Sequence, residues 1–149
     1  MTEIEIQLMK HEGSKKNKEG RHIIYQDTVG KWSCGYGRNL SDVGISEDEA
    51  LYLLHSDIDK ARQQLNKWLP WTSILDRVRY DCLVNMTFNM GIGGLLQFKK
   101  MLAYAKEGKY KETSIEMLNS RWADQVGKNP GQRAHELSEQ MRTGEYRLN

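Results

Sequence analysis

The segment Asp27-Thr-Val-Gly-Lys-Trp-Ser-Cys-Gly-Tyr-Gly-Arg-Asn-Leu40 decides the fold of the N-terminal part of the chain. Strand-forming residues flank a turn in which Asp27 offers a side-chain acceptor and Gly30 tolerates a positive φ. The pattern predicts a β-hairpin that carries Asp27 and Ser33 on opposite arms.

Two glycines follow on the second arm of this hairpin. Gly35 and Gly37 alternate with Tyr36, and a missing side chain at every second position lets another backbone or an extended ligand approach closely. We therefore expect the second arm to continue through these residues and to form the floor of a cleft.

Two carboxylates and a hydroxyl belong to this region of the sequence. Glu12, in His11-Glu12-Gly13, precedes the hairpin that carries Asp27 and Ser33. Paired carboxylates are the groups with which glycosidases cleave a sugar–sugar bond. Taken alone, Glu12 is more simply interpreted as an exposed surface residue at the end of a helix.

Length, composition and charge limit the class of protein. The chain has 149 residues, 38% hydrophobic and 28% charged, which is typical of one soluble globular domain without membrane insertion or disorder. The net charge of +2 is too small to predict a nucleic-acid partner. Several basic residues would favour an anionic polymer, although each alone is most simply a solvated surface charge: Lys15, Lys16, Lys18, Arg21, Arg133, Arg142 and Arg147.

We expect no disulfide, metal site or cofactor. Cys34 and Cys82 lack the spacing of metal ligands and are predicted to be buried free thiols in a reducing compartment. Residues 91–94 lack the Lys-Ser/Thr of a phosphate-binding loop, so they are predicted to form a turn between helices. The histidines are scattered without metal spacing: His11, His22, His55 and His135.

The rest of the chain is predicted to be helical. Helices are expected over residues 2–12 and about 46–67. Each begins with a capping box: Thr2 with Glu5, and Ser46 with Glu49. The later helices are marked by apolar residues at helical spacing that are core by default: Ile74, Val78, Cys82 and Met86; Leu95, Phe98, Met101, Leu102 and Ala105; Tyr110, Ile115 and Leu118; and, after Asn129-Pro130, Ala134, Leu137 and Met141 before Gly144.

Several blocks of the sequence together resemble the phage-type lysozymes, the endolysin family of the T-even phages. In chain order these blocks are His11–Gly13, Tyr25–Gly30, Gly35–Leu40, Ile45–Ala50, Asn85–Gly91, Ser120–Trp122 and Met141–Gly144. The resemblance implies an α+β fold, mainly α, with a small β-hairpin lobe, a long connecting helix and a helical C-terminal lobe. It further implies one lysozyme-like domain over 1–149, with the small lobe at about 13–45, the connecting helix at about 46–67 and the helical lobe at about 68–149, into which helix 2–12 packs.

The resemblance also assigns roles to residues. Glu12 matches the general acid, Asp27 the second catalytic carboxylate, and Ser33 a position usually held by Thr. The implied substrate-binding residues are Asn39, Phe88, Asn89, Met101, Glu116, Arg121 and Gln125, and the residue type differs from the family at Asn39, Met101 and Glu116.

Two charged pairs are implied as well, in which Arg133 pairs with Glu12, and Arg38 pairs with Asp57 between the lobes.

The chain departs from the family in three places. The polar residues 15–20 lengthen the spacing between the two carboxylates and are expected to form a solvent loop at the cleft entrance. The segment between Leu40 and Ser46 is shorter, which predicts a reduced small lobe. Ser33 keeps the hydroxyl of Thr but loses the β-branch that restricts χ1.

The activity implied by the resemblance is hydrolysis of the β-1,4 bond between N-acetylmuramic acid and N-acetylglucosamine in peptidoglycan, for host cell lysis. Glu12 would protonate the leaving oxygen, while Asp27 and Ser33 hold a water on the opposite face, as in an inverting glycosidase. Two alternatives stay open: a lytic transglycosylase acting on the same bond with a glutamate alone, and a non-catalytic protein that binds the wall or perturbs the membrane.

The N-terminus suggests where the protein would act. Its first nine residues lack the basic and apolar regions of a signal peptide. We therefore expect a monomer that stays in the host cytoplasm until a holin-type pore admits it to the periplasm of a Gram-negative host.

Overall fold

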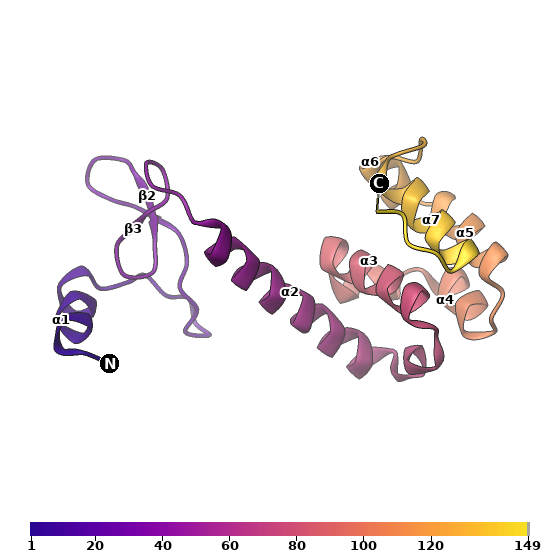
Figure 1. Cartoon of the computed structure of the whole chain (residues 1–149), viewed down its shortest axis with the longest axis horizontal. Coiled ribbons are helices and arrows are strands. Elements are labelled where there is room, and N and C mark those ends of the chain that lie inside the picture. The colour runs from indigo at the N-terminus through magenta and orange to yellow at the C-terminus, as the bar shows by residue number, and fades with distance from the viewer. Residues whose placement is uncertain (149) are drawn as a thin grey trace. The chain divides into compact units, whose positions relative to one another are not determined.

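The computed structural model describes residues 1–148 of the chain (Figure 1). They divide into two compact units, one up to Leu53 and one from Leu54 onward. The first contains α1 (Glu3–Glu12), β1 (Tyr25–Gln26), β2 (Trp32–Cys34), β3 (Arg38–Asn39) and the start of α2 (Glu47–Trp68). The second contains the rest of α2, the 3-10 helix η1 (Pro70–Ile74), α3 (Arg77–Leu96), α4 (Lys99–Lys106), α5 (Tyr110–Leu118), α6 (Arg121–Val126) and α7 (Arg133–Thr143). The predicted α+β class, mainly α, is confirmed.

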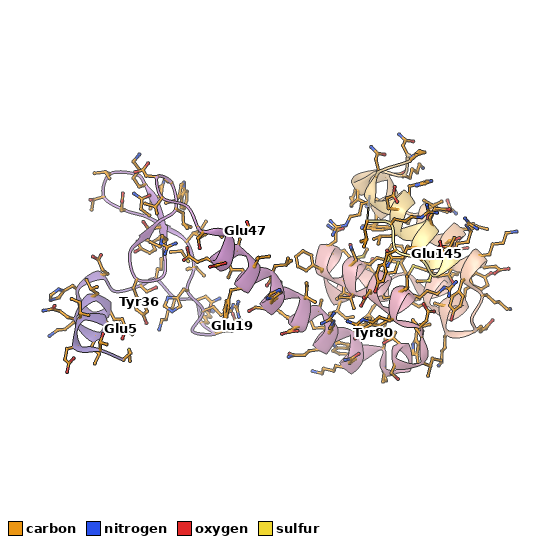
Figure 2. The ribbon with its side chains drawn as sticks, in the orientation of Figure 1. Glu5, Glu19, Tyr36, Glu47, Tyr80 and Glu145 are labelled. Carbon is orange, nitrogen blue, oxygen red and sulfur yellow. The ribbon has the colours of Figure 1, made fainter. Side chains whose placement is uncertain are left out.

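Side-chain caps set the ends of the helices as the sequence predicted. At the start of α1, the Glu5 N–H donates to Thr2 Oγ1 (3.3 Å) and the Thr2 N–H donates to Glu5 Oε2 (2.6 Å); Glu5 is labelled in Figure 2. Gly13 follows α1 with a φ of 63°, and Gly144 follows α7 with a φ of 74°. A glycine accepts these left-handed angles without steric cost, so it ends a helix cleanly.

The strands form a three-stranded antiparallel sheet in the order β1-β2-β3. Ser33 in the central strand lies opposite Tyr25 on one side and Asn39 on the other. Directly paired residues of antiparallel strands point to the same face of the sheet. Tyr25, Ser33 and Asn39 therefore share one face, and Trp32 and Cys34 point to the other.

The prediction that the second arm continues through Gly35 and Gly37 is wrong. Their φ angles are 65° and 83°, and such left-handed angles turn the chain where an extended strand requires a negative φ. Residues 35–37 form a turn, and the chain returns as the third strand, β3.

The apolar core lies in the second unit. Its most completely buried side chains include Leu65, Leu83, Met86, Leu95, Met101, Met117 and Met141. Helices α5 and α7 lie side by side in this unit (Figure 1). Most of the apolar residues that were predicted as core positions of the later helices are buried or packed against this core.

Two predicted core positions are wrong, because Ile74 is 71% exposed and Ile115 is 54% exposed. Ile74 ends the 3-10 helix η1, where the repeat is about three residues per turn and the α-helical spacing to Val78 does not apply. Ile115 lies two residues from both Thr113 and Met117, two of the three buried residues of α5, and residues two apart on a helix do not share a face.

Other element boundaries also differ from the prediction. The turn expected at residues 91–94 is a kink at Gly91 (φ 78°) inside α3, and the last helix begins at Arg133 rather than near Pro130. Helix α6, capped by the Ser120 hydroxyl accepting from the Ala123 N–H (3.1 Å), was not predicted.

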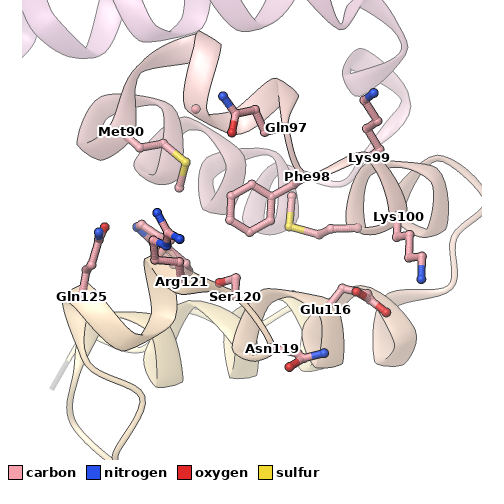
Figure 3. A pocket seen from close by; sticks show the side chains of 13 residues that line it. Met90, Gln97, Phe98, Lys99, Lys100, Glu116, Asn119, Ser120, Arg121 and Gln125 are labelled. Atoms are coloured by element: carbon pink, nitrogen blue, oxygen red, sulfur yellow. The ribbon is translucent and has the colours of Figure 1, made fainter.

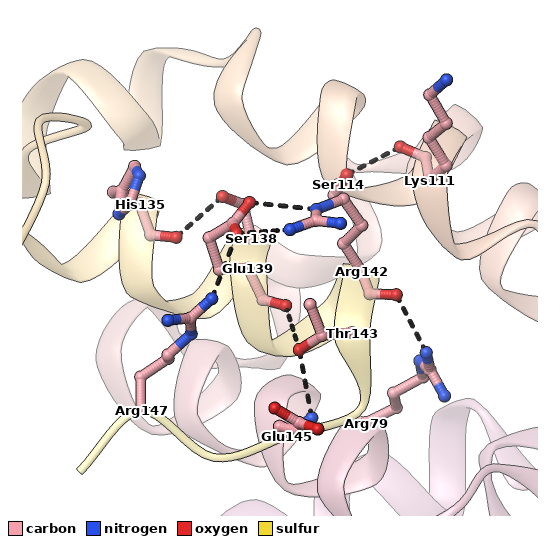
Figure 4. Close-up of polar contacts among 10 residues, drawn as sticks. All are labelled: Arg79, Lys111, Ser114, His135, Ser138, Glu139, Arg142, Thr143, Glu145 and Arg147. Carbon is pink, nitrogen blue, oxygen red and sulfur yellow. Dashed lines mark hydrogen bonds and ion pairs between the residues drawn. The ribbon is translucent and has the colours of Figure 1, made fainter.

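Arg79 of α3 forms hydrogen bonds with the C-terminal end of α7. Its Nε donates to the Met141 carbonyl (2.6 Å) and a terminal nitrogen donates to the Arg142 carbonyl (3.0 Å), as Figure 4 shows for Arg142. These carbonyls belong to the last turn of α7, where no helical N–H follows to pair with them. The guanidinium also stacks on the Tyr110 ring at 3.8 Å from its centroid. Figure 4 also shows Glu139 of α7 paired with Arg142 and Arg147.

No helix within residues 1–148 combines the length and the apolar character needed to cross a bilayer.

We expect Glu49 to make the stability of the first unit depend on pH. Hydrogen bonds from Arg38 and then from Ser46 lower its pKa from 4.5 to about 2. Its contribution to stability is therefore complete above the ordinary pKa and is lost as the pH falls toward the lowered one. The melting temperature of the wild type should exceed that of Glu49→Gln near neutral pH, and the gap should close in strong acid.

Glu47→Gln is the matched control, since Glu47 also lies in the first turn of α2 but its carboxylate bonds to no side chain within residues 1–148. A gap between wild type and Glu49→Gln that stays constant across the acidic range would contradict this linkage.

Candidate active site

Glu12 is the last residue of α1, and its carboxylate lies against the turn between β2 and β3. A Cβ atom placed on Gly37 would lie 3.0 Å from Glu12 Oε2 and 3.1 Å from its Cδ. The group that lies close to this glycine is thus the side-chain carboxylate of Glu12, whereas the sequence predicted another backbone or an extended ligand.

Asp27 is held by the hairpin turn itself. Its Oδ1 accepts hydrogen bonds from the N–H groups of Val29 and Lys31, both at 2.9 Å, while its own N–H donates to the Lys31 carbonyl (2.8 Å). Within residues 1–148, both hydrogen bonds to this carboxylate end on Oδ1, so Oδ2 can accept a hydrogen bond from a water or a substrate hydroxyl.

Ser33 lies between Tyr25 and Asn39 on the central strand and is only 5% exposed. Within residues 1–148, no hydrogen bond is formed by its hydroxyl, so this group has both its donor and its acceptor capacity available. The side-chain amide of Asn39, in contrast, already forms two hydrogen bonds: it donates to Asp42 Oδ2 and accepts from the Asp42 N–H, both at 3.1 Å. A substrate that contacts Asn39 would have to compete with Asp42 for these hydrogen-bonding groups.

Arg38 forms an ion pair with Glu49 at 2.8 Å and also donates to the Gly44 carbonyl (3.2 Å). Glu49 is thus a capping residue and an ion-pair partner at once, since the Ser46 N–H also donates to it. The predicted pairing of Arg38 with Asp57 joins the two units and stays a prediction.

In the second unit, a pocket of about 490 Å³ is lined by residues from α3, α4, α5 and α6. Four of the predicted substrate-binding residues line it: Met101, Glu116, Arg121 and Gln125. Figure 3 shows Met90 and Phe98 projecting toward Arg121 and Gln125 across this pocket. Met101 is 1% exposed and belongs to the core, so it forms part of the pocket's inner wall.

The sequence did not predict the apolar wall of this pocket. Phe98 packs edge-on against Trp122, with ring centroids 6.2 Å apart. Asn89, predicted to bind substrate, accepts a hydrogen bond from Trp122 Nε1 (2.8 Å) and so orients that ring. The signal for Trp122 was present in the Ser-Arg-Trp block, whereas Phe98 was assigned to the core.

Phe88 and Arg133 line a second hollow of about 320 Å³ in this unit, which also contains Asn85. The Arg133 guanidinium donates twice to Asn85 Oδ1, at 3.1 and 2.9 Å. Its predicted pairing with Glu12 joins the two units and stays a prediction.

The two cysteines, Cys34 and Cys82, are both free thiols. Cys82 is buried, which raises the pKa of its thiol, and its Sγ donates to the Leu137 carbonyl at 3.3 Å. Cys34 is half-buried, not buried as predicted, because its strand belongs to a small sheet with little cover. Over the described part of the chain, no three side chains of His, Cys, Asp or Glu are grouped to hold a metal ion.

Comparison with known proteins gives one family and two relatives. Residues 16–139 match the model of the phage lysozyme family. A probable T4-type lysozyme 1 of Dictyostelium discoideum is 35% identical over 114 residues, covering 74% of this chain and 66% of the relative. A probable T4-type lysozyme 2 of the same organism is 28% identical over 143 residues, covering 76% of this chain and 84% of the relative. The chain thus spans slightly less than two thirds of the first relative's length.

We expect Gly37→Ala to lower the rate at which the protein clears purified peptidoglycan by about tenfold or more, because a misplacement of about 1 Å at a reacting group costs up to about 100-fold. The new methyl group would meet Glu12 Oε2 at 3.0 Å.

Gly35→Ala is the matched control. Its φ of 65° imposes a similar backbone strain, but a Cβ there meets no atom within 4 Å. Melting temperatures of both variants separate loss of folding from loss of turnover. Equal activity in the two variants would show that contact with Glu12 is unimportant.

Proposed function

Because the chain belongs to the phage lysozyme family, we propose that it hydrolyses the β-1,4 bond between N-acetylmuramic acid and N-acetylglucosamine in bacterial peptidoglycan. This family consists of peptidoglycan-hydrolysing glycoside hydrolases. The observation that carries the proposal is the combination, in one unit, of Glu12 against Gly37 and a fixed Asp27 on the hairpin that presents Ser33.

In the proposed mechanism, Glu12 protonates the oxygen of the leaving sugar. Asp27 and Ser33 hold the attacking water, which reaches the opposite face of the sugar as an oxocarbenium-like transition state develops. The two backbone N–H groups on Asp27 Oδ1 fix the carboxylate so that its other oxygen is presented in one direction. The free Ser33 hydroxyl supplies a second hydrogen bond to the same water. This mechanism inverts the anomeric carbon.

The pocket of the second unit supports binding of a glycan. Phe98 offers a half-buried apolar ring, with the buried Trp122 packed against it, and Arg121 and Gln125 offer hydrogen-bond donors beside it. A carbohydrate needs this mixture, because each ring has apolar C–H faces and a polar edge.

The hydrogen bonds of Asp27 support hydrolysis over lytic transglycosylation, and a Glu12 variant distinguishes hydrolysis from wall binding alone. A lytic transglycosylase has no need of a second carboxylate held by two N–H groups beside a free hydroxyl, as Asp27 is beside Ser33. A protein that only binds the wall or perturbs a membrane would kill equally well without Glu12.

The proposed setting is lysis of a bacterial host, with the enzyme kept in the host cytoplasm until a pore opens to the periplasm. The two free cysteines, Cys34 and Cys82, support synthesis in a reducing compartment.

We expect Glu12→Gln to abolish clearing of purified peptidoglycan while the melting temperature stays close to that of the wild type. Gln keeps the shape and the contact with Gly37 but has no proton to give, and general acid catalysis contributes about 100- to 10,000-fold in rate. Retention of more than about a tenth of the wild-type rate, equivalent to a barrier change of at most about 1.4 kcal/mol, would remove Glu12 from the role of acid.

For the cellular setting, the protein should be produced in the cytoplasm of a Gram-negative bacterium with and without a co-expressed pore-forming holin. We expect rapid lysis only with the holin, and none when the enzyme carries Glu12→Gln. Lysis by the wild type without any pore would argue against the proposed confinement to the cytoplasm.

A further inference from the structure

Positive charge is concentrated in one short segment beside the candidate acid. Residues 15–21 contain four cations, Lys15, Lys16, Lys18 and Arg21, against the single carboxylate of Glu19. The net charge of this segment, +3, is larger than the +2 of the entire chain. The rest of the protein is therefore slightly acidic, so the charge of the segment is a local property and not the general character of the surface.

The segment has a defined structure, and residues 15–23 are called here the cationic hairpin. Lys16 and His22 form an antiparallel bridge, flanked by hydrogen bonds from the Asn17 N–H to the Arg21 carbonyl and from the Ile23 N–H to the Lys15 carbonyl, each at 2.9 Å. At the tip, Asn17 Oδ1 accepts from the N–H groups of Glu19 and Arg21, both at 3.0 Å. The loop predicted at the cleft entrance is thus an ordered turn that displays its side chains.

The four cations are exposed and unpaired among the described residues. Lys15, Lys16, Lys18 and Arg21 all lie at the surface, and no ion pair within residues 1–148 includes any of them. Exposed lysines elsewhere in the described chain, such as Lys60, Lys106 and Lys111, are also outside any ion pair, but they lie on three different helices, so what sets the cationic hairpin apart is the clustering of its cations. Figure 2 labels Glu19, the single acidic residue of the cationic hairpin. The charge of this surface is therefore available to a partner.

The cationic hairpin and Glu12 both contact the turn between β2 and β3. The Ser14 hydroxyl is hydrogen-bonded to His22 Nδ1, and the His22 ring packs edge-on against Tyr36 with centroids 5.1 Å apart. Tyr36 precedes Gly37, against which the Glu12 carboxylate lies. These contacts lie within the first unit, so the cations and the candidate acid keep a fixed relation to each other.

We propose that the cationic hairpin binds the free carboxylates of the peptide stems on the peptidoglycan strand that is being cut, an inference that rests on the proposed function. Four separate cations on a ridge suit a polymer with recurring carboxylates better than one small anion, which would need a cradle. The sugars themselves are uncharged, so the stem carboxylates supply the negative charge of the strand. Lysine ammonium groups on flexible stems bind such groups as point charges.

The composition of the cationic hairpin argues against two other anionic partners. A lipid surface is bound by cations combined with apolar side chains that enter the acyl region, and the one aliphatic side chain of the cationic hairpin, Ile23, is half-buried. Single-stranded nucleic acid is bound by cations combined with aromatic rings on which bases stack, and the single ring here, His22, is engaged with Tyr36.

The test compares two triple variants with the same change in net charge. Lys15→Gln, Lys16→Gln and Lys18→Gln remove charge from the cationic hairpin. Lys60→Gln, Lys106→Gln and Lys111→Gln remove it from exposed lysines of the second unit that line none of the hollows described above. Each set is measured as an active enzyme and in a Glu12→Gln background, in which pelleting with insoluble peptidoglycan reports binding without cleavage. Melting temperatures confirm that all variants are folded.

We expect the hairpin variant to bind native peptidoglycan about tenfold more weakly, within the range of about 10- to 1,000-fold attributed to electrostatic steering, with a correspondingly raised KM and an unchanged kcat. The control variant should bind like the wild type. On peptidoglycan whose carboxylates are blocked by carbodiimide and ethanolamine, wild type and hairpin variant should bind equally, and both should lose their sensitivity to salt.

Four outcomes would overturn the proposal. Equal binding of wild type and hairpin variant would show that the cations are not used, and equal losses in hairpin and control variants would show an effect of net charge alone. A difference that persists on carboxylate-blocked peptidoglycan, or hairpin-dependent binding to phosphatidylglycerol vesicles, would assign the cations to another anionic partner. The pelleting assay needs no turnover, so an enzyme that binds through the cationic hairpin yet clears no peptidoglycan would refute the proposed function alone.

Discussion

The first unit depends on the pairing of a very short central strand. Trp32–Cys34 is bonded on one side to Tyr25–Gln26 and on the other to Arg38–Asn39. A register shift of one residue would turn Ser33 to the opposite face and bring Trp32 or Cys34 in its place. What fixes the register is Asp27, whose backbone and side chain together make four hydrogen bonds across the turn. The residue assigned to hold the water therefore also holds the sheet together, so its structural and chemical roles cannot be removed separately by truncation.

The conformation of two glycines also positions Glu12, the candidate acid, relative to this sheet. Gly35 and Gly37 adopt angles that other residues avoid, and the turn they form brings a backbone without a side chain against Glu12. The neighbouring Tyr36 contacts His22, which belongs to the cationic hairpin. One turn of three residues thus joins the candidate acid, the sheet and the cationic surface. This explains how a unit without a large apolar core can keep its polar groups in defined positions.

The sequence predicted those features that depend on local interactions. The capping boxes at Thr2 and Ser46, the glycine ends of α1 and α7, and the hairpin with Asp27 and Ser33 on opposite arms involve residues a few positions apart, so the pattern contains the information. The turn at Gly35–Gly37 was missed because two glycines separated by one residue are compatible with an extended strand and with a tight turn. Helix α6 was missed because six residues are too few to show a helical period. The Glu49 partner of Arg38 and the Asn85 partner of Arg133 were missed because long side chains choose partners by tertiary geometry.

The central claim is that a fixed carboxylate and a free hydroxyl direct water onto the sugar. It is tested most directly by cleaving purified peptidoglycan in ¹⁸O-labelled water and examining the new reducing end at once by mass spectrometry and NMR. The account predicts N-acetylmuramic acid that carries the label and is released as the α anomer, because water attacks the face opposite the departing sugar. An unlabelled anhydro-sugar would show that no water attacks, and a labelled β anomer would show retention through a covalent intermediate. Either result would contradict the roles assigned to Asp27 and Ser33.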